Sequence, residues 1–342
     1  MIDWVTATLP FSSAQKFAGG FVRSIDADGV VQWQTEKRLP VVGSHDAHFH
    51  IVSKGEGFIN ISGNPSKFLQ GHNLFGSDNL LGLVTEVMKR ICKALNVPIR
   101  VNDYLAWRTG NYVLQRVDIA YMYSLESRAN VRAWLRAAEY QSKSRHGRPI
   151  SKGGTVYWGK HSRRWAMKAY GKADELTSTK DHRLPQTIPN GDLLLNYAED
   201  KLRVELVLRS MQLKDLSPLD TARHWTDDLP AKLHGHFLES IDMSNQFTLT
   251  ETAVQDLPAR LVAVYKLWKN GEDLRAMYPK NTFYRYRRQL LEHDIDIAVV
   301  QPKASDNVIQ LIRALRPQAV AHVPDWAKGT DLYFDASCKK AA

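Results

Sequence analysis

The amino-acid sequence predicts an α+β protein in which an antiparallel sheet with covering helices precedes a mainly helical domain. Through the first two-thirds of the chain, short strand-like and helix-like segments alternate without a parallel repeat. After residue 250 the apolar positions follow helical periodicity, and prolines and histidines interrupt the pattern between these two parts. We therefore predict an N-terminal domain at 1–213, a connecting region at 214–250 and a helical domain at 251–342.

Three segments of the predicted sheet, at 113–123, 164–172 and 202–209, carry charged side chains on one face and apolar side chains on the other. The polar faces contain Arg116 and Asp118, then Lys168, Tyr170 and Lys172, and finally Arg203, Glu205 and Arg209. A carboxylate in mid-strand is costly unless it is paired or binds a metal. The pattern fits a solvated face with cross-strand ion pairs as well as a catalytic surface, and periodicity does not decide between them.

The charge balance favours a polyanionic partner. The sequence contains 46 Lys and Arg residues against 36 Asp and Glu, a formal charge of +10. Basic residues gather in Arg145–Arg164 and Lys280–Arg288. Such clusters are typical of nucleic-acid binding, because each neutralised phosphate releases counterions. Arg163 and Arg164 of the first cluster are candidate DNA contacts, as is Arg116 on the polar strand face.

Composition also excludes several classes of protein. No segment approaches the ~18 consecutive apolar residues of a membrane-spanning helix, and the first residues lack the basic and apolar regions of a signal peptide. The two cysteines, Cys92 and Cys338, do not suffice for a disulfide framework or a zinc site. We therefore expect a cytoplasmic protein that does not bind membranes.

The helical region contains a segment that resembles a helix-turn-helix. A short helix at 272–278 is followed by a tight turn and a second helix at about 282–292. Residues at the start of the second helix suit base contacts, whereas the arginines further along suit phosphates. The candidate DNA-binding residues here are Lys280, Asn281, Tyr284, Arg285, Arg287 and Arg288. A solvated basic helix is the alternative interpretation.

Six sequence blocks occur in a distinctive order. They are Gly63-Asn64-Pro65-Ser66-Lys67-Phe68-Leu69-Gln70-Gly71-His72-Asn73-Leu74-Phe75-Gly76; Arg116-Val117-Asp118-Ile119-Ala120; Ser162-Arg163-Arg164 with Ala169-Tyr170-Gly171-Lys172; Arg203-Val204-Glu205; Pro279-Lys280-Asn281-Thr282-Phe283-Tyr284-Arg285-Tyr286; and Pro324-Asp325-Trp326. Together they resemble the gene II replication initiators of filamentous phages over most of the chain. The segment 155–172 also resembles the hairpin before the catalytic tyrosine in plasmid rolling-circle initiators of the Rep-trans class.

This resemblance implies a rolling-circle replication initiator that nicks the plus strand at a phage origin and rejoins it after a round of synthesis. The family's Ala-Tyr-x-Lys block implies that Tyr170 forms a covalent 5′-phosphotyrosine and leaves a 3′-OH primer. The resemblance further implies that Asp118 and Glu205 hold a metal, and oxygen ligands favour Mg²⁺ or Mn²⁺. Lys168 and Lys172 are expected to favour the phenolate and to stabilise charge on the phosphate.

The implied partners are phage or prophage origin DNA, single-stranded at the nick, together with a host helicase and polymerase. A helicase must be recruited because the sequence contains no Gly-x-x-x-x-Gly-Lys nucleotide-binding loop. The expected location is the cytoplasm of the bacterial host.

Several assignments stay open from sequence. His48 and His50 share one strand face and form an alternative metal site. Tyr157 is either a second nucleophile or a residue that packs beside Trp158, and the polar segment 70–73 either shapes a turn or contacts DNA. The alternative functions are a non-catalytic origin-binding regulator and a metal-dependent endonuclease that uses water.

Overall fold

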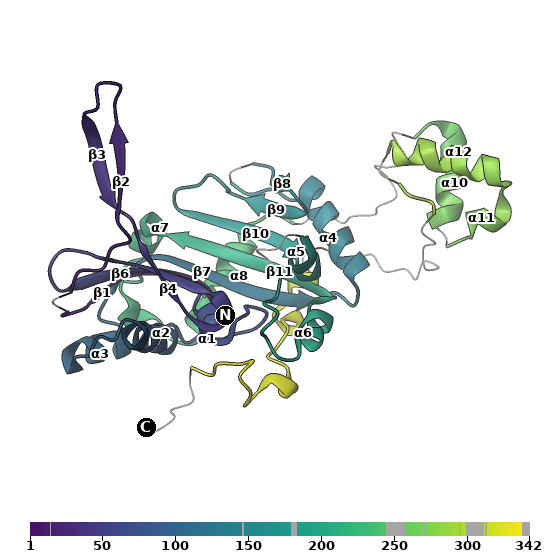
Figure 1. The fold of residues 1–342 in the computed structure, drawn as a ribbon. Helices are drawn as coiled ribbons and strands as arrows, with labels where there is room; N and C mark the ends of the chain where they lie inside the picture. Colours follow the sequence, from purple (N-terminus) through teal and green to yellow (C-terminus); the bar gives the residue numbers. More distant parts are fainter. Residues whose placement is uncertain are drawn as a thin grey trace. The chain divides into compact units, whose positions relative to one another are not determined.

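Two units make up the chain (Figure 1). The computed structural model describes residues 1–342 except residues 14, 146, 179–182, 244–256, 270, 294, 299–310, 312 and 337–342. Unit 1 comprises Met1–Met243 and Ala314–Ala342, and unit 2 comprises Ser244–Arg313. Unit 2 is therefore an insertion into the sequence of unit 1.

Unit 1 is built on an antiparallel sheet whose described strands follow the order β4-β5-β6-β1-β7-β11-β10-β9-β8. These strands are β1 Ile2–Pro10, β4 Leu39–Val42, β5 His48–Ser53, β6 Phe58–Gly63, β7 Val113–Ser124, β8 Ile150–Lys152, β9 Thr155–Trp158, β10 Trp165–Gly171 and β11 Lys201–Arg209. A separate ribbon of β2 Phe21–Ile25 and β3 Val31–Glu36 projects from the sheet (Figure 1). The predicted antiparallel sheet is confirmed.

Polar side chains cap some of the helices of unit 1. Asn79, for example, accepts a hydrogen bond from the backbone amide of Gly82 at 2.7 Å and so caps α2. The helices are α1 Pro65–Gln70, α2 Leu80–Ala94, α3 Val101–Arg108, α4 Arg128–Gln141, α5 Lys172–Ser178, α6 Gly191–Ala198, α7 Ser210–Asp215 and α8 Leu229–Glu239, with 3₁₀ turns at Ser44–Asp46, Ala222–His224, Pro317–Ala319 and Asp325–Ala327. A further 3₁₀ turn, Arg313–Leu315, spans the boundary with unit 2. Cys92 is buried on α2, and Cys338 lies outside the described residues.

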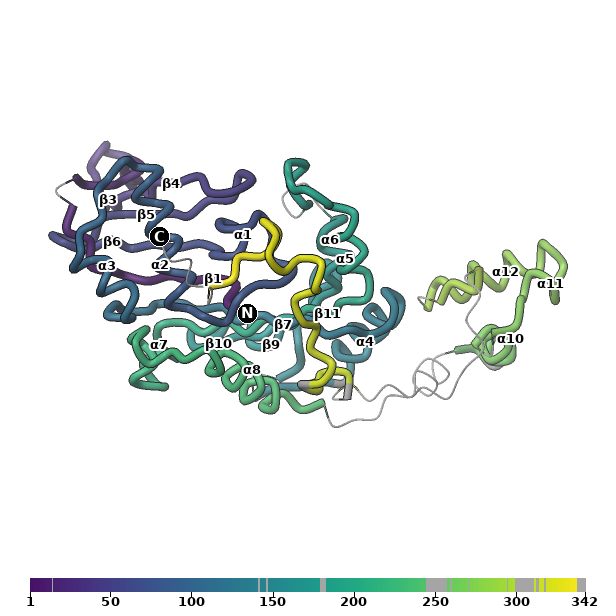
Figure 2. The backbone as a smooth tube through the Cα atoms, turned by 90° about the horizontal axis from the view of Figure 1, so that it is seen from below, coloured from purple at the N-terminus to yellow at the C-terminus, as the bar shows by residue number. Residues whose placement is uncertain are grey.

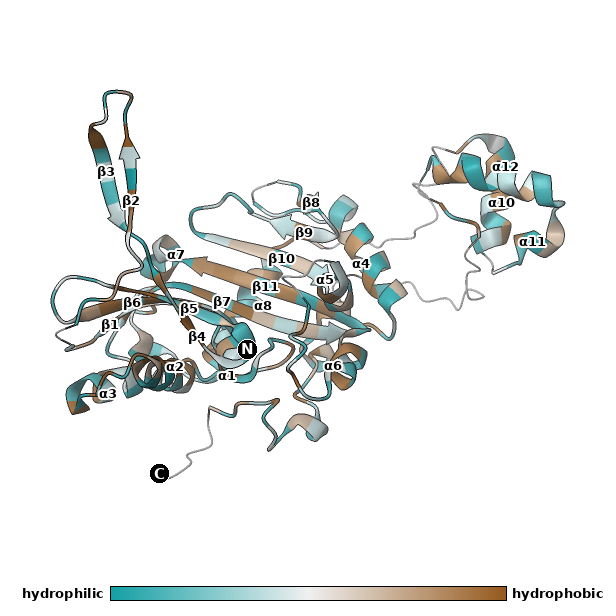
Figure 3. Cartoon of the chain, in the orientation of Figure 1, coloured by the Kyte–Doolittle hydropathy of each residue, from teal (hydrophilic) through white to brown (hydrophobic). Residues whose placement is uncertain are grey.

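The apolar face of the sheet forms the core of unit 1. Helices and the C-terminal segment lie over one side of the sheet (Figure 2), and hydrophobic residues run along its central strands (Figure 3). Helix α8 covers β11 and β10: the Phe237 ring lies 5.0 Å from that of Trp165, and His234 Nε2 lies 3.1 Å from the carbonyl oxygen of Val204. Since side chains alternate along each strand, the opposite face keeps the charged residues.

The structure corrects the predicted domain boundaries. Residues 214–243, which were assigned to a connecting region, include α8 and pack on the sheet; only residues beyond Met243 leave unit 1. The prolines of this region predict a break in regular structure, but Pro230 lies in the first turn of α8, where proline does not interrupt a helix. The residues 244–250 of the predicted connection lie outside the described residues.

The C-terminal segment also departs from the predicted helical domain. It returns to unit 1, where the amide of Ala321 donates to the carbonyl of Met122 at 2.7 Å and Val320 forms a β-bridge with Tyr123. In Figure 2 this segment, coloured yellow, runs beside α6, where the Tyr197 hydroxyl donates to the carbonyl of His322 at 3.1 Å. It contains the Pro324-Asp325-Trp326 block, so that block belongs to the fold of the sheet unit.

Unit 2 contains the predicted helices around a small core of its own. Its described helices are α10 Ala259–Lys269, α11 Leu274–Met277 and α12 Lys280–Leu291. Phe283 and Leu290 of α12 are buried beside Leu261, Val264 and Leu274. The mainly helical character is confirmed, whereas the likeness to a helix-turn-helix stays a prediction, because α11 has only four residues.

Replacing His234 with Gln is expected to flatten the pH dependence of unit 1 stability between about pH 6.5 and 4. Burial lowers the pKa of His234 from 6.5 to about 4, although the bond to Val204 opposes this shift. The stabilisation from the neutral imidazole is thus present above pH 6.5 and is lost as the pH falls toward 4, by up to about 3 kcal/mol. Glutamine keeps a donor for the Val204 carbonyl and does not titrate.

Thermal unfolding of both proteins at pH 7 and pH 5 measures this difference. His236→Gln, on an exposed position of the same helix, is the control and should retain the wild-type pH dependence. An unchanged slope in His234→Gln would contradict the prediction.

Candidate active site

Glu205 is the centre of a polar cluster on the face of the sheet opposite the core. Its carboxylate accepts a hydrogen bond from the Tyr170 hydroxyl, and it lies 2.7 Å from Lys168 Nζ and 2.8 Å from Arg203 Nε. The register explains this convergence, because Lys168 of β10 lies opposite Glu205 of β11 and Tyr170 lies opposite Arg203. Tyr170, Lys168 and Glu205, which the sequence placed on one face, are therefore brought together.

Burial and charge set opposite protonation preferences for the phenol and the carboxyl group. Burial alone opposes ionisation of Glu205, but the charges of Arg203 and Lys168 outweigh it and lower the pKa of Glu205 to about 2. Burial, followed by the negative charge of Glu205, raises the pKa of Tyr170 well above 10. In this state the cluster therefore contains an ionised carboxylate and a protonated phenol.

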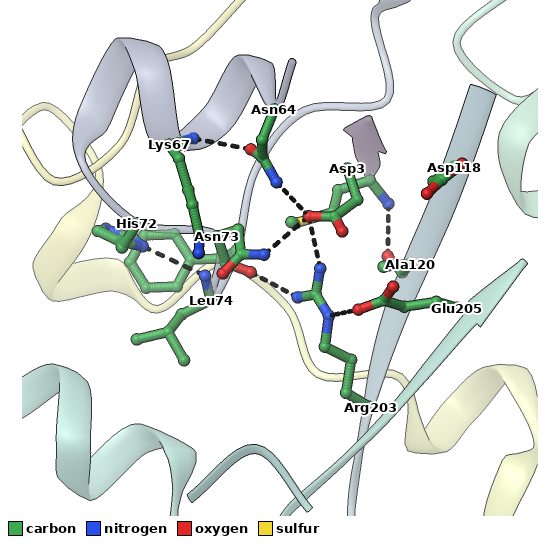
Figure 4. A network of polar contacts seen from close by, with 12 residues as sticks. Asp3, Asn64, Lys67, His72, Asn73, Leu74, Asp118, Ala120, Arg203 and Glu205 are labelled. Carbon is green, nitrogen blue, oxygen red and sulfur yellow. Dashed lines mark hydrogen bonds and ion pairs between the residues drawn. The ribbon is translucent and has the colours of Figure 1, made fainter. Parts of the chain in front are cut away.

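Arg203 links the cluster to the N-terminal strand and to the segment before α2 (Figure 4). Its guanidinium is fully buried, forms an ion pair with Asp3 of β1 at 2.7 Å and donates to the carbonyl of Asn73. Asp3 also accepts hydrogen bonds from the side-chain amides of Asn64 at 2.7 Å and Asn73 at 2.8 Å. A buried charge is tolerated only with such pairing.

Asp3 was missed by sequence reasoning. The signal was present, because residues 2–9 contain the β-branched residues and partial alternation of a strand, with a carboxylate near its start. A register shift between Ile2 and Trp4 breaks the alternation, so the strand is easily overlooked.

The polar segment 70–73 has a structural role in the described chain. Asn73 bonds Asp3, and the Gln70 side chain donates to the carbonyl of Phe75 at 2.8 Å. His72 Nε2 lies 2.9 Å from the carbonyl oxygen of Leu332. The segment thus holds the C-terminal residues against the sheet, and all three side chains are buried.

Lys172 has different partners from Lys168. It is the first residue of α5 and is buried, and its ammonium contacts Glu175 and lies 3.1 Å from the side-chain oxygen of Asn73. The ammonium is 6.0 Å from the centre of the Tyr170 ring. Burial lowers the pKa of Lys172 to about 8. Lys168 is therefore the lysine that directly contacts the Glu205 cluster.

Asp118 lies on the same sheet face as Glu205, on the neighbouring strand. Glu205 pairs with Ala120 in the register, and Asp118 lies two residues before Ala120 on β7, so its side chain is on the same face. Arg116 donates two hydrogen bonds to Asp118, at 2.7 and 2.6 Å. Burial raises the pKa of Asp118 to about 6, although Arg116 opposes this shift.

The carboxylates of Asp118 and Glu205 are oxygen ligands of the kind that Mg²⁺ prefers, but each already has a cationic partner. Within the described residues, no three His, Cys, Asp or Glu side chains are close enough to hold a metal. Mg²⁺ commonly takes one or two carboxylates and completes its shell with water and substrate phosphate. Both carboxylates are buried, Asp118 beside Arg116 and Glu205 beside Arg203 and Lys168.

The alternative metal residues lie elsewhere. His48 and His50 are exposed on β5, and β6 and β1 separate that strand from β7, which carries Asp118. Of the predicted DNA contacts, Arg163 is exposed and Arg164 forms an ion pair with Asp215.

The residues of unit 2 that were predicted to contact DNA differ in exposure. Arg287 is partly buried and donates to Asp296 at 2.7 and 2.8 Å, so its charge has a partner within the unit. The exposed positions are Lys280, Asn281, Tyr284, Arg285 and Arg288.

Comparison with known proteins identifies the class to which this chain belongs, that of phage replication initiators. Residues 1–228 match the family model for the N-terminal part of the replication-associated gene II protein, and residues 249–332 match the model for its C-terminal part. The chain belongs to this gene II protein family. It is 41% identical over 323 residues to the replication-associated gene II protein of Enterobacteria phage I2-2, covering 92% of this chain and 93% of that protein.

The resemblance to the filamentous-phage initiators is thereby confirmed. No solved structure matches the chain. Among the described residues, no helix has the length and apolar character needed to cross a membrane.

Replacing Asp3 with Ala is expected to lower the free energy of unfolding of unit 1 by about 3 kcal/mol, because the buried Arg203 guanidinium loses one of its two carboxylate partners. Asp3→Asn, which keeps an acceptor oxygen, should cost less. Chemical denaturation measures both changes. Glu56→Ala, at an exposed position, is the control and should stay within about 0.5 kcal/mol of the wild type. A loss of similar size in Asp3→Ala and Glu56→Ala would contradict the assigned role.

Proposed function

We propose that this member of the gene II protein family initiates rolling-circle replication by cutting the plus strand at the phage origin with Tyr170. The observation that carries the proposal is the hydrogen bond between the buried Tyr170 hydroxyl and Glu205, in a cluster that also holds Lys168. A nucleophile beside a carboxylate and a cation is an arrangement suited to phosphodiester exchange.

In the proposed step, the Tyr170 oxygen loses its proton and attacks the scissile phosphorus. A bond forms between that oxygen and phosphorus, the bond from phosphorus to the 3′ oxygen breaks, and the 3′ oxygen leaves with a proton. One phosphodiester replaces another, so the reverse reaction rejoins the strand without ATP. The free 3′ hydroxyl serves as the primer for a host polymerase.

The protonation states of Tyr170 and Glu205 in the free protein imply that the site becomes reactive only when DNA is bound. With a pKa well above 10, Tyr170 is a poor nucleophile, and Glu205 is too weak a base to hold its proton. Asp118 and Glu205 would hold Mg²⁺ or Mn²⁺, which polarises a non-bridging phosphate oxygen when bound. Arg116, once released from Asp118, and Lys168 are positioned to stabilise negative charge on the phosphate.

We assign recognition of the duplex origin to the basic helix α12. Its exposed Arg285 and Arg288 suit phosphates, and Asn281 and Tyr284 near its start suit base edges. The proposed setting is the cytoplasm of a bacterial host, with a host helicase to open the duplex. A regulator without catalysis and a nuclease that uses water are the competing functions, and neither requires a tyrosine beside Glu205.

Tyr170→Phe is expected to abolish covalent attachment to DNA and to reduce nicking at least a thousandfold, because it removes the attacking oxygen. The measurement is incubation with supercoiled origin plasmid and Mg²⁺, followed by denaturing gels for relaxed circles and a protein–DNA adduct. Tyr157→Phe is the matched control and should retain the adduct. An adduct formed by Tyr170→Phe would overturn the assignment, and wild-type nicking without any adduct would favour a water-dependent nuclease.

Arg285→Ala and Arg288→Ala are each expected to weaken duplex binding and to reduce the slope of log K against log salt by about 1. Fluorescence anisotropy with an origin duplex at several salt concentrations measures the slope. Arg287→Ala is the control: it loses an ion pair within unit 2, so its slope should stay near that of the wild type. Equal slopes in all three variants would argue against phosphate contacts from this helix.

A further inference from the structure

We propose that two aromatic side chains, Trp4 and Tyr157, each stack on an unpaired DNA base on either side of the scissile phosphate. This inference rests on the proposed function and adds the contacts that position the single strand. Each ring has a cation beside it, and the two rings lie on opposite sides of the Tyr170–Glu205 pair. Base–aromatic stacking beside a cation is the usual way in which proteins bind single strands.

Tyr157 lies beside the nucleophile on the strand next to β10. It is opposite Lys168 in the register, so its side chain is on the same face as Tyr170, whereas the adjacent Trp158 is buried in the core. The ammonium of Lys160 lies 4.6 Å from the centre of the Tyr157 ring. Tyr157 and Trp158 therefore lie on opposite faces of the sheet. The interpretation that Tyr157 packs beside Trp158 does not hold.

A pocket connects Tyr157 to the nucleophile. Its volume is about 200 Å³, and its lining includes Tyr157, Lys168, Tyr170 and the Gly153-Gly154 turn. Nothing lies within 4 Å of where a Cβ would be on either glycine, so the turn leaves this side open. The pocket is smaller than the roughly 300–1,000 Å³ that hold whole small-molecule ligands, which suits one ring at most.

Trp4 occupies the corresponding place on the other side of the site. It is half-buried on β1, opposite Asp118 in the register, and its ring lies 5.6 Å from the guanidinium carbon of Arg116. The indole nitrogen lies 3.2 Å from the hydroxyl of Ser62 and 3.3 Å from that of Thr6. These contacts hold the ring in a fixed orientation, which lowers the entropy lost on stacking.

The spacing of the two rings suits a short single strand. Four strand intervals separate β1 from β9, with β7, β11 and β10 between them, so the two backbones are about 19 Å apart at the usual ~4.8 Å spacing. A strand laid across the sheet therefore passes over Asp118, Glu205 and Tyr170 between its two stacked bases.

The direction of the strand follows from the chemistry. The Tyr170 hydroxyl points toward Glu205, from β10 toward β11. In-line attack puts the leaving 3′ oxygen on the far side of phosphorus, toward β7 and β1. The nucleotide that keeps the 3′ hydroxyl thus lies on the Trp4 side, and the nucleotide transferred to Tyr170 lies on the Tyr157 side.

The test uses the full-length protein with single-stranded oligonucleotides that carry the nick site, mapped beforehand with the wild type. Trp4→Ala and Tyr157→Ala are each expected to raise KM about tenfold with a smaller change in kcat, and Trp4→Phe and Tyr157→Phe should restore most of it. Trp33→Ala, which removes an exposed tryptophan from the β2–β3 ribbon, is the matched control with unchanged KM.

Abasic nucleotides, measured first with the wild type and then with each alanine variant, identify which base each ring holds. An abasic site 5′ of the nick should weaken the wild type but add little to Trp4→Ala, and one 3′ of the nick should do the same with Tyr157→Ala. Additive losses, or an unchanged KM in both alanine variants while the Tyr170 adduct still forms, would overturn this inference alone. If the wild type forms no adduct with the intact oligonucleotide, the proposed function itself fails.

Discussion

The fully buried guanidinium of Arg203 constrains the rest of unit 1. A cation with no access to water needs several fixed partners, and here they are Asp3 from the first strand, Glu205 from β11 and a carbonyl from the 70–73 segment. Segments that are far apart in sequence must therefore meet on one face of the sheet before this charge is satisfied. The same contacts fix Glu205, the residue that bonds the Tyr170 hydroxyl.

The network also sets the protonation states of the proposed site. The cations that stabilise ionised Glu205 leave it with little basicity, and the negative charge of Glu205 in turn keeps the phenol of Tyr170 protonated. Reactivity is then expected only when DNA and a divalent cation change this balance. Such dependence would restrict cutting to a correctly bound strand, and positioning of bases on both sides of the phosphate would strengthen the restriction.

The order of the family blocks along the chain has a structural explanation. His72 of the 70–73 segment contacts Leu332, and residues 320–321 pair with the end of β7, so the described part of the C-terminal segment belongs to unit 1. The helical unit is inserted between α8 and this segment. Both ends of the insertion that carries the basic helix α12 are thereby attached to one folded unit.

Sequence patterns were enough to establish the α+β class, the alternation that puts Asp118, Tyr170 and Glu205 on polar strand faces, and the family to which the chain belongs. These features are local, because periodicity and short motifs can be recognised in the sequence without knowledge of the fold. Which strands are neighbours, and hence that Lys168 contacts Glu205 while Lys172 turns to Glu175, depended on the register of the sheet. Only the tertiary structure shows the role of Asp3, the return of the C-terminal segment to the sheet and the partners of Arg203. All three depend on contacts between segments that are distant in sequence, and the side-chain pattern along one strand does not predict such contacts.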